Sequence, residues 1–479
     1  MGKLLALLAA IAVVLAACSS GGDDAAIADA PEPEEGPANE PEGEFEFNLP
    51  TGAVIDFGTA PVSPEGDLSP ENQAALELIT STDIDELPFT NEQIEAIGFL
   101  GESGDPRLAW VFSDILRFTR DAGRAVALGD ASNALLGDEF NGSDWGALTD
   151  RLLAWDIPAP PGYIDAKRAI YSSILSEWEP FFEPNGIVDW RSVSWGGVRI
   201  DDQPYNETPG TTCNCIPAVD NPEVMTVAQA NEGDWLTPDT VIFGVEINGE
   251  ARAYPRQIME VREMVNDTLG GRDFGMPYCT LCGSAQVWFT DNLPEGIERP
   301  ILRTSGLLTR SNKVMYELNT NSVFDTFLGN ALTGPLLEAG IQLEQHTVVT
   351  SSWGAWSEEH PDTTVLVEEL ALGRDFDFRA NRDADGPIFP IGDVDPRLDV
   401  QEDVLGIIRE DGTPIAFHVN SAIGALQAGQ TISVDGINIV LSGDGIRAID
   451  DDGNDIVGHQ SFWFAWSQFN EDTDLWPEV

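Results

Sequence analysis

The chain has 479 residues, of which 82 are Asp or Glu and only 24 are Lys or Arg, so its formal net charge is -58 at pH 7. Such a charge repels nucleic acid and anionic headgroups, which argues against any partner that is bound through its phosphate groups. The hydrophobic fraction of 42% is ample for a buried core, and the length favours two or three domains.

Residues 1–18 have the pattern of a bacterial lipoprotein signal peptide. Lys3 supplies a charged start, residues 4–15 form an unbroken apolar run, and small residues precede Cys18. The run is too short to be a membrane-spanning helix but has the length of a signal-peptide core. Because the end of the run resembles a lipobox, we expect Cys18 to become the lipidated N-terminus. The mature protein would then be extracytoplasmic, at the cell surface or in the periplasm, and held to the membrane by its lipid anchor. The alternative is an ordinary signal peptide with an incidental cysteine.

Two segments of different character follow the signal. Residues 19–68 are rich in Gly, Ser, Asp, Glu and Pro, which predicts a disordered acidic tether. Residues 69–200 read as a helical domain, because Ser69 before a proline and Thr90 in a capping-box pattern each begin a run of apolar residues at helical spacing. No catalytic constellation occurs in this domain, so the sequence favours a scaffold or docking role for it.

From residue 201 onward the pattern changes to short β-branched and aromatic runs between turn residues. Residues 241–247 and 251–254 flank an Asn-Gly pair and predict a tight β-hairpin. This hairpin recurs at 404–417, and the Trp-Gly-Ala-Trp-Ser segment at 353–357 recurs as Trp-Phe-Ala-Trp-Ser at 463–467. We expect the paired tryptophans to be buried in the core.

The repeat leads to a prediction of the α+β class, with an N-terminal helical domain followed by a duplicated, mainly antiparallel β domain that contains a few helices. The first β-rich unit would span 201–370 and carry the cysteine loop. The second, shorter unit would span 371–479, and it contains no cysteine.

A string of motifs in the β region resembles the bacterial domain-of-unknown-function family 3179 over about residues 210–476. The matching segments are Ile-Pro-Ala-Val-Asp-Asn-Pro at 216–222, Gly-Glu-Ala-Arg-Ala-Tyr-Pro at 249–255, Val-Asn-Asp at 265–267, Tyr-Cys-Thr-Leu-Cys-Gly-Ser-Ala at 278–285, Thr-Ser-Gly-Leu at 304–307 and the segment that begins at Trp353. The resemblance implies an extracytoplasmic globular domain with the cysteine loop as its hallmark. It carries no established reaction.

This chain departs from the family pattern at two places near the loop. Family members usually have Trp-His-Glu where this chain has Val261-Arg262-Glu263, so a histidine ligand or base is missing there. They also usually have Pro after the first cysteine of the loop, where this chain has Thr280.

Apart from Cys18, the cysteines form two close pairs: Cys213 and Cys215, and Cys279 and Cys282. An even number of cysteines outside the cytoplasm suggests disulfides, here two long-range bridges between the pairs. The same four thiolates could instead bind Zn(II), or two or three of them Cu(I). A third alternative is a redox pair within the loop, which requires a lowered thiolate pKa.

Other polar residues near the loop could line a ligand pocket. They are Arg252, Tyr254, Asn266, Asp267, Tyr278 and Ser305. The simpler interpretation of several of them is hydrogen bonding within hairpins and turns.

The sequence leaves three functions open. The first is a non-catalytic module that binds a metal ion or small ligand at the cysteine loop. The second is a structural or interaction lipoprotein whose cysteines serve only as disulfide staples. The third is an enzyme of redox or hydrolytic type, with no catalytic residue assigned.

Overall fold

The computed structural model describes residues 47–81, 89–137, 144–183, 185–207, 214–233, 235–368 and 386–478. The chain divides into two units, Met1–Glu44 and Phe45–Val479, and all the described residues belong to the second. The expected signal peptide and Cys18 therefore lie outside the described residues. Within the described ranges, no helix combines the length and the apolar character that crossing a bilayer requires.

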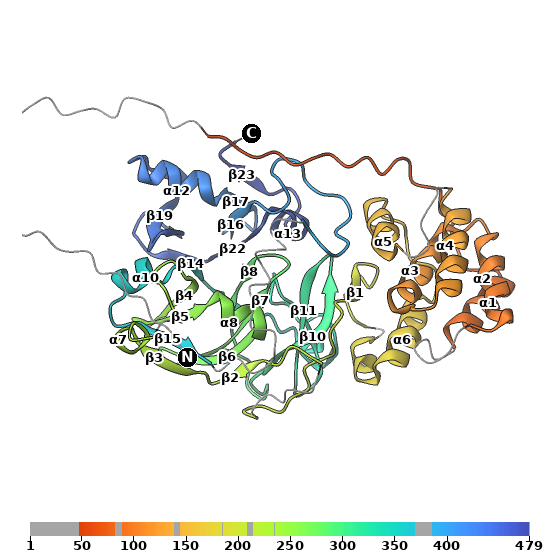
Figure 1. The fold of residues 1–479 in the computed structure, drawn as a ribbon, viewed down its shortest axis with the longest axis horizontal. Helices are drawn as coiled ribbons and strands as arrows, with labels where there is room; N and C mark the ends of the chain where they lie inside the picture. The colour runs from red at the N-terminus through yellow and green to blue at the C-terminus, as the bar shows by residue number, and fades with distance from the viewer. Residues whose placement is uncertain are drawn as a thin grey trace, which may run out of the picture. The chain divides into compact units, whose positions relative to one another are not determined.

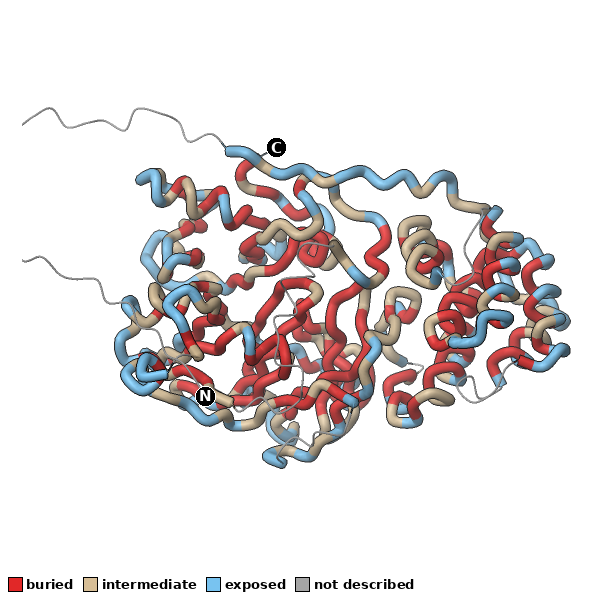
Figure 2. Tube along the Cα trace, viewed as in Figure 1, coloured by how far each residue is buried: buried red, intermediate tan, exposed pale blue. Residues whose placement is uncertain are grey.

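The N-terminal part of the described chain is helical. Its α-helices are α1 (Pro70–Thr80), α2 (Asn91–Gly101), α3 (Ala109–Phe118), α4 (Ala122–Leu136), α5 (Trp145–Ala154) and α6 (Tyr163–Ile174), with short 3-10 helices η1 (Pro106–Leu108) and η2 (Ser176–Phe181). Ser69 caps α1 and Thr90 forms a capping box at the start of α2, so the two predicted helix starts are confirmed. In Figure 2 the buried residues of these helices line the inside of the bundle.

The helices share a hydrophobic core with the first of five β-sheets. This core includes Leu307, Val314 and Tyr316 from that sheet. The buried Lys167 ammonium donates to the Asp114 carboxylate at 2.7 Å and to the backbone carbonyl of Val193 at 2.6 Å, which ties the helices to the sheet. The helical and β parts are therefore packed together as one compact unit.

The β part consists of five small sheets (Figure 1). In sheet order, the first contains β1 (Val193–Trp195), β10 (Leu302–Thr309), β11 (Asn312–Glu317) and β12 (Val323–Asp325). The second contains β13 (Glu344–His346), β9 (Val287–Phe289), β7 (Arg272–Cys279), β6 (Met264–Leu269) and β2 (Val219–Asp220), with β8 (Ser284–Ala285) paired to β7. The third contains β14 (Val349–Ser352), β4 (Val241–Ile247), β5 (Glu250–Pro255), β15 (Thr364–Val367) and β3 (Glu223–Thr226).

The remaining two sheets come from the C-terminal part of the chain. The fourth contains β22 (Gly458–Phe462), β16 (Asp403–Ile408), β17 (Pro414–His418) and β23 (Asp474–Trp476). The fifth contains β18 (Ile432–Val434), β19 (Ile437–Ser442), β20 (Gly445–Ile449) and β21 (Asp455–Ile456). Short helices connect the strands: α7 (Val227–Ala230), α8 (Arg256–Arg262), α9 (Gly334–Glu338), α10 (Trp353–Glu359), α12 (Val419–Gln427) and α13 (Trp463–Phe469).

The predicted fold class is wrong. The β part is a five-bladed, propeller-like arrangement of small sheets, with the long helices confined to the N-terminal region; it is not a duplicated antiparallel domain of the α+β class. Parallel pairing of β15 with β5, of β23 with β17 and of β2 with β6 also departs from the antiparallel expectation. The error has a physical reason, because short strands reveal their own period but not how many sheets they will form.

The repeated sequence corresponds to two of the five blades, the third and the fourth sheet. Each is built on an antiparallel hairpin flanked by one antiparallel and one parallel strand. In each, a glycine of the hairpin lies against a tryptophan: a Cβ at Gly244 would come within 2.5 Å of the Trp356 ring, and one at Gly406 within 2.1 Å of the Trp466 ring. The repeated tryptophans are buried, as the sequence predicts.

Residues 47–68 cross the outside of the unit as an extended segment, drawn in red in Figure 1. The backbone N–H of Asp399 donates to the carbonyl of Pro50 at 2.7 Å. The Arg107 guanidinium donates to the carbonyl of Gly66 at 2.9 Å. The last part of the segment assigned to a tether therefore lies hydrogen-bonded against the folded chain.

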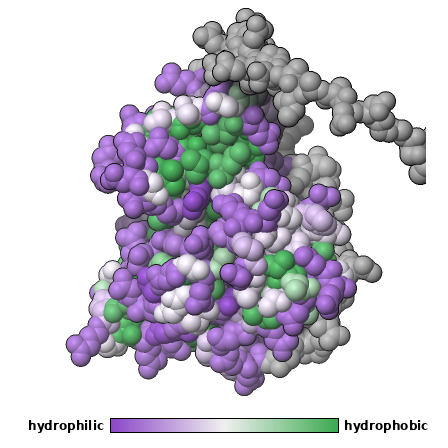
Figure 3. Space-filling model, turned by 90° about the vertical axis from the view of Figure 1, so that its left-hand side faces the viewer, coloured by the Kyte–Doolittle hydropathy of each residue, from purple (hydrophilic) through white to green (hydrophobic). Residues whose placement is uncertain are grey.

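The outer surface is largely hydrophilic on the face shown in Figure 3, where the largest apolar area lies in the upper half and smaller ones lie below it. Most of the tryptophans and phenylalanines are buried in six hydrophobic clusters, and Trp145, Trp155, Trp195, Trp235 and Trp476 are half-buried against them.

Candidate functional site

The cysteine loop connects β7 to β8 in a tight turn. Cys279 is the last residue of β7 and pairs with Ser284 of β8, and the Cys282 N–H donates to the Cys279 carbonyl at 3.2 Å. Gly283 completes the turn with φ +61°, a conformation that favours glycine. Because the turn brings residues three apart face to face, the Cys279 and Cys282 Sγ atoms lie only 3.0 Å apart.

Both cysteines of the loop are free and buried. The Cys282 thiol donates to the backbone carbonyl of Ser311 at 3.4 Å, while the backbone N–H of Lys313 donates to Cys279 Sγ at 3.4 Å. The expected bridges from the loop to the Cys213/Cys215 pair are therefore not formed.

The pKa values of the two thiols shift in opposite directions from the ordinary cysteine value. Burial and the charge of Glu263 raise the pKa of Cys279, but the contact with Cys282 and the N–H and charge of Lys313 outweigh them, so the pKa lies below the ordinary cysteine value. Burial, together with the neighbouring Cys279, raises the pKa of Cys282 well above that value. The thiolate of the pair therefore forms more readily on Cys279 than on Cys282.

Lys313 is held in place by three acceptors. Its ammonium lies 3.0 Å from Glu263 Oε2, and it donates to the Glu263 backbone carbonyl at 2.7 Å and to Thr304 Oγ1 at 3.1 Å. An ammonium has three protons, so all three are used. Thr280 donates to the other carboxylate oxygen of Glu263 at 3.4 Å, which links the ion pair to the loop.

Glu263 ends α8 in a left-handed conformation, with φ 53° and ψ 1°. A residue other than glycine adopts this conformation at a cost, and such strain is concentrated at functional sites. The conformation presents the Glu263 carbonyl to the Tyr278 N–H at 3.0 Å as well as to Lys313. The neighbouring Arg262 pairs instead with Glu368, its Nε lying 2.6 Å from Glu368 Oε2.

A cavity of about 310 Å³ opens onto Cys279. Its polar lining consists of Glu260, Glu263, Cys279, Thr280, Thr304 and Lys313. Its apolar lining includes Ile216, Leu281, Leu307, Leu308 and Phe389. The cavity therefore places the Cys279 thiol, one ammonium group and two carboxylates beside an apolar wall.

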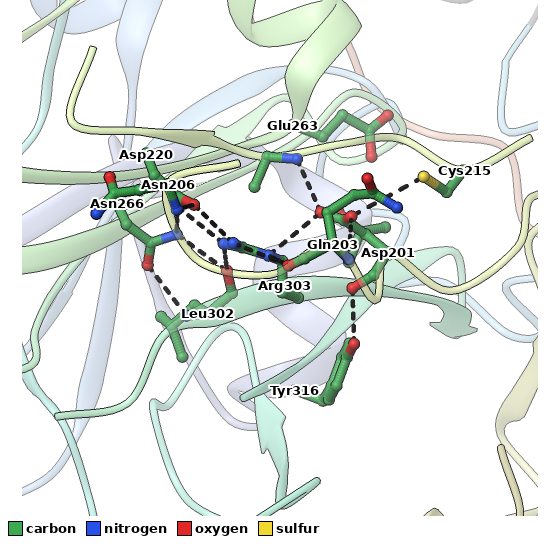
Figure 4. A network of polar contacts seen from close by, with 12 residues as sticks. Asp201, Gln203, Asn206, Cys215, Asp220, Glu263, Asn266, Leu302, Arg303 and Tyr316 are labelled. Atoms are coloured by element: carbon green, nitrogen blue, oxygen red, sulfur yellow. Dashed lines mark hydrogen bonds and ion pairs between the residues drawn. The ribbon is translucent and has the colours of Figure 1, made fainter. Parts of the chain in front are cut away.

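A buried ion network supports one side of this cavity (Figure 4). Arg303 is only 1% exposed, and its guanidinium lies 2.7 Å from Asp220 and 3.5 Å from Asp201. Asn266 donates to the same Asp220 at 2.9 Å, and the Tyr316 hydroxyl donates to the Asp201 carbonyl at 2.6 Å. Since Arg303 precedes Thr304 on β10, the network fixes the strand that supplies the cavity wall.

Most of the other predicted pocket residues serve hydrogen bonding between strands. Arg252 pairs with Asp267 at 2.6 Å, and the Tyr254 hydroxyl donates to the same carboxylate at 2.7 Å. Ser305 donates to the Val314 carbonyl at 2.5 Å, and Tyr278 packs against the Phe243 ring at 4.8 Å. These four side chains and those of Asn266 and Asp267 do not line the cavity at Cys279.

The second cysteine pair does not complete a metal site among the described residues. Cys213 lies outside them, and Cys215, which is not one of the free thiols, has its sulfur 3.9 Å from Asp201. In the described part of the chain, no group of three or more His, Cys, Asp or Glu side chains is arranged to hold a metal ion.

Sequence reasoning missed Lys313, Glu260 and the hydroxyl of Thr304 as parts of the site. One signal could have found Lys313, because the chain contains only three lysines and this one follows the Thr-Ser-Gly motif closely. A buried ammonium beside the loop differs from a surface charge, because the free-energy cost of burying it must be compensated by its partners.

Comparison with known proteins agrees with the resemblance that the motifs carry. The family model described as "Protein of unknown function (DUF3179)" matches residues 213–451, a range that includes both cysteine pairs. Searches of curated proteins and of solved structures gave no match. The chain thus belongs to the DUF3179 family, with the cysteine loop and most of the cavity inside the matched region.

Proposed function

We propose that the protein is a thiol–disulfide oxidoreductase, with Cys279 and Cys282 passing between the dithiol and the disulfide. The observation that carries this proposal is the 3.0 Å contact between two free sulfurs, of which one lines a cavity. A disulfide bond is about 2.05 Å long, so the two sulfurs need to approach by only about 1 Å. The lowered pKa of Cys279 and the raised pKa of Cys282 support the separate roles that this exchange requires, an attacking thiolate and a resolving thiol.

The exchange proceeds in two balanced steps. The Cys279 thiolate attacks one sulfur of a substrate disulfide, forming a mixed disulfide and expelling one substrate thiolate. The Cys282 thiol then attacks Cys279 Sγ and displaces the second substrate sulfur, which takes up the Cys282 proton. The substrate disulfide is thereby reduced to one thiolate and one thiol, while the loop is oxidised to its disulfide.

The test is a redox titration of the mature protein in dithiothreitol buffers, read by intact mass after the thiols are trapped. We expect a reversible two-electron transition within the range of known dithiol proteins, about -120 to -270 mV. Cys279→Ser and Cys282→Ser should each abolish it while the fold is kept. A loop that stays in the dithiol form throughout, or that oxidises only on unfolding, would contradict the proposal.

A non-catalytic ligand-binding role is the second candidate, and the cavity favours it. About 310 Å³ with an apolar wall and convergent polar groups is typical of a small-molecule site. If ligands bind equally well to the wild type and to Cys279→Ser, and the loop has no redox transition, this function replaces the first.

We also propose that the protein is a lipid-anchored extracytoplasmic protein modified at Cys18. The signal pattern of residues 1–18 supports this location, where thiol–disulfide chemistry is common. Radiolabelled palmitate should be incorporated into the wild type in its native host and not into Cys18→Ser. Label in both proteins, or in neither, would contradict the anchor.

A further inference from the structure

We infer that a second cavity, between the third and the fifth blade, binds a free α-amino acid, whose carboxylate pairs with Arg447 and whose ammonium group pairs with Asp455 and Glu246. This cavity shares no lining residue with the one at Cys279, so the inference goes beyond the proposed redox function. Its supports are the construction of the cavity, a guanidinium without a partner and two carboxylates in the same lining.

The two blades hold the cavity between them. Strand β14 of the third blade packs against β20 of the fifth. The Asp444 carboxylate fixes this contact, because it accepts from the Ser351 hydroxyl at 2.8 Å and from the Ser352 N–H at 2.7 Å. The cavity has a volume of about 230 Å³. This lies below the range for drug-sized ligands, about 300–1,000 Å³, so the cavity suits a compact ligand.

Arg447 on β20 is the guanidinium of this lining. Among the residues that the structure describes, its side chain makes no hydrogen bond and no ion pair, and its Nε is buried. Arg409, which follows β16, is by contrast paired with Asp474 at 2.7 Å. A buried donor without an acceptor is costly, and a guanidinium binds a carboxylate through two parallel N–H bonds. Arg447 therefore offers its fork to a carboxylate that enters the cavity.

Two carboxylates line the same cavity without forming an ion pair with Arg447. Asp455 accepts from the Thr347 hydroxyl at 2.5 Å, and Glu246 Oε2 lies 3.9 Å from His360 Nδ1. Burial raises the pKa of Asp455, while the hydrogen bond from Thr347 and the charge of Arg447 oppose the rise. Arg447 and Asp455 thus act on each other electrostatically, although they do not touch.

A ligand with both charges satisfies this lining best. A simple carboxylate would pair with Arg447 but would be repelled by Asp455 and Glu246. A simple amine would pair with these acids but would leave the guanidinium without an acceptor. An α-amino acid carries an ammonium and a carboxylate on one carbon atom, which also agrees with the small volume.

The experiment screens the twenty common L-amino acids by thermal shift on the mature protein. Each one that raises the melting temperature is then titrated by calorimetry, together with its deaminated and its decarboxylated analogue. For alanine these analogues are propionate and ethylamine. We expect at least one amino acid to bind about 10- to 100-fold more tightly than both of its analogues, because each analogue leaves one charge of the cavity without its partner.

Two variants assign the binding to this cavity. Arg447→Met should weaken the amino acid about tenfold or more and leave the decarboxylated analogue unchanged, because that analogue has no carboxylate to lose. Asp455→Asn should weaken the amino acid and should not weaken the deaminated analogue. Arg409→Met is the matched control, since Arg409 does not line the cavity, and its binding should equal that of the wild type.

The stability of the ligand-free protein keeps this test clear of misfolding. Because Arg447 has no partner among the described residues, Arg447→Met should melt at the temperature of the wild type or above it. Arg409→Met, which loses an ion pair, should melt at the same temperature or below it.

The outcomes separate this inference from the proposed redox function. Amino-acid binding should persist in Cys279→Ser, and the redox titration of Arg447→Met should match that of the wild type. The inference is overturned if no amino acid binds, if either analogue binds as tightly as its parent, or if Arg447→Met and Asp455→Asn bind as the wild type does. Loss of binding in Cys279→Ser would place the ligand at the cysteine loop and would overturn it as well.

Discussion

Lys313 contacts Glu263 twice, through the carboxylate at 3.0 Å and through the backbone carbonyl at 2.7 Å. This double contact joins β11 to the end of α8 directly beside Cys279. The ammonium is buried, so its charge acts on the sulfur with little screening by water. The acidity of the loop therefore depends on a residue that follows it by more than thirty positions in the sequence.

We predict that Lys313→Met raises the pKa of Cys279, because the variant loses the positive charge that stabilises the thiolate. The rate of alkylation by iodoacetamide at neutral pH should fall by roughly tenfold, and its pH profile should move to higher pH. Lys167→Met is the matched control, since Lys167 is also buried and paired with a carboxylate, at 2.7 Å from Asp114. Each variant should lose about 3–5 kcal/mol of stability. An unchanged alkylation profile in Lys313→Met would show that the charge does not act on the thiol.

The two cysteines should respond differently to single substitution. Cys282→Ser leaves the nucleophile without its partner, so treatment with cystamine should give a stable mixed disulfide at Cys279, visible by mass. Cys279→Ser leaves only the enclosed sulfur of raised pKa, so no adduct should form on the same time scale. Equal adduct formation in the two variants would contradict distinct roles for Cys279 and Cys282.

His459 should make stability depend on pH. Burial lowers the pKa of this histidine to about 4 from an unfolded value of about 6.5, so the unfolded chain binds the proton more readily. The contribution of His459 to the free energy of unfolding is therefore complete above pH 6.5. It is lost as the pH falls toward 4, and the loss amounts to about 3 kcal/mol.

The variant His459→Asn tests this dependence, because its amide can keep the hydrogen bond to Gln345, which is 3.0 Å long in the wild type. Urea unfolding from pH 7 to pH 4 should show a shallower loss of stability for the variant. Parallel curves for the two proteins would mean that the imidazole of His459 does not control how stability changes between pH 4 and pH 7.

The close glycine–tryptophan contacts of the repeated blades predict a steric effect. Gly406→Ala places a methyl group about where the Trp466 ring lies, at 2.1 Å, so the core must shift at a cost of about 1–3 kcal/mol. Gly98→Ala in α2 is the control, since a Cβ there meets nothing within 4 Å, and it should stabilise the helix by about 0.5–1 kcal/mol. Denaturant unfolding measures both, and a neutral effect of Gly406→Ala would contradict the tight packing.

Local features of the fold could be predicted from the sequence, and long-range ones could not. The starts of α1 and α2 follow from hydrogen bonds made within four residues of Ser69 and Thr90, so local sequence determines them. The number of blades depends on which strands pair, and β1 pairs with β10 across more than a hundred residues. No periodicity within a strand encodes that partner.

The same division applies to the site. The spacing of Cys279 and Cys282 within one turn made the loop recognisable, because two thiols three residues apart converge in a turn. The state of the thiols was not predictable, since it depends on Lys313 from β11 and on Glu263 in its left-handed conformation. Both reach the loop only through tertiary packing.

The pairing of β1 with β10 has a consequence for dissecting the molecule. A fragment that begins where the family match does, at residue 213, would lack Val193–Trp195 and the helices. It would leave β10 at the edge of its sheet, paired only with β11, and expose Leu307, Val314 and Tyr316, which now lie in the shared core. The region that sequence comparison delimits is therefore smaller than the region that can fold by itself, and such a fragment would aggregate instead of presenting an open cavity.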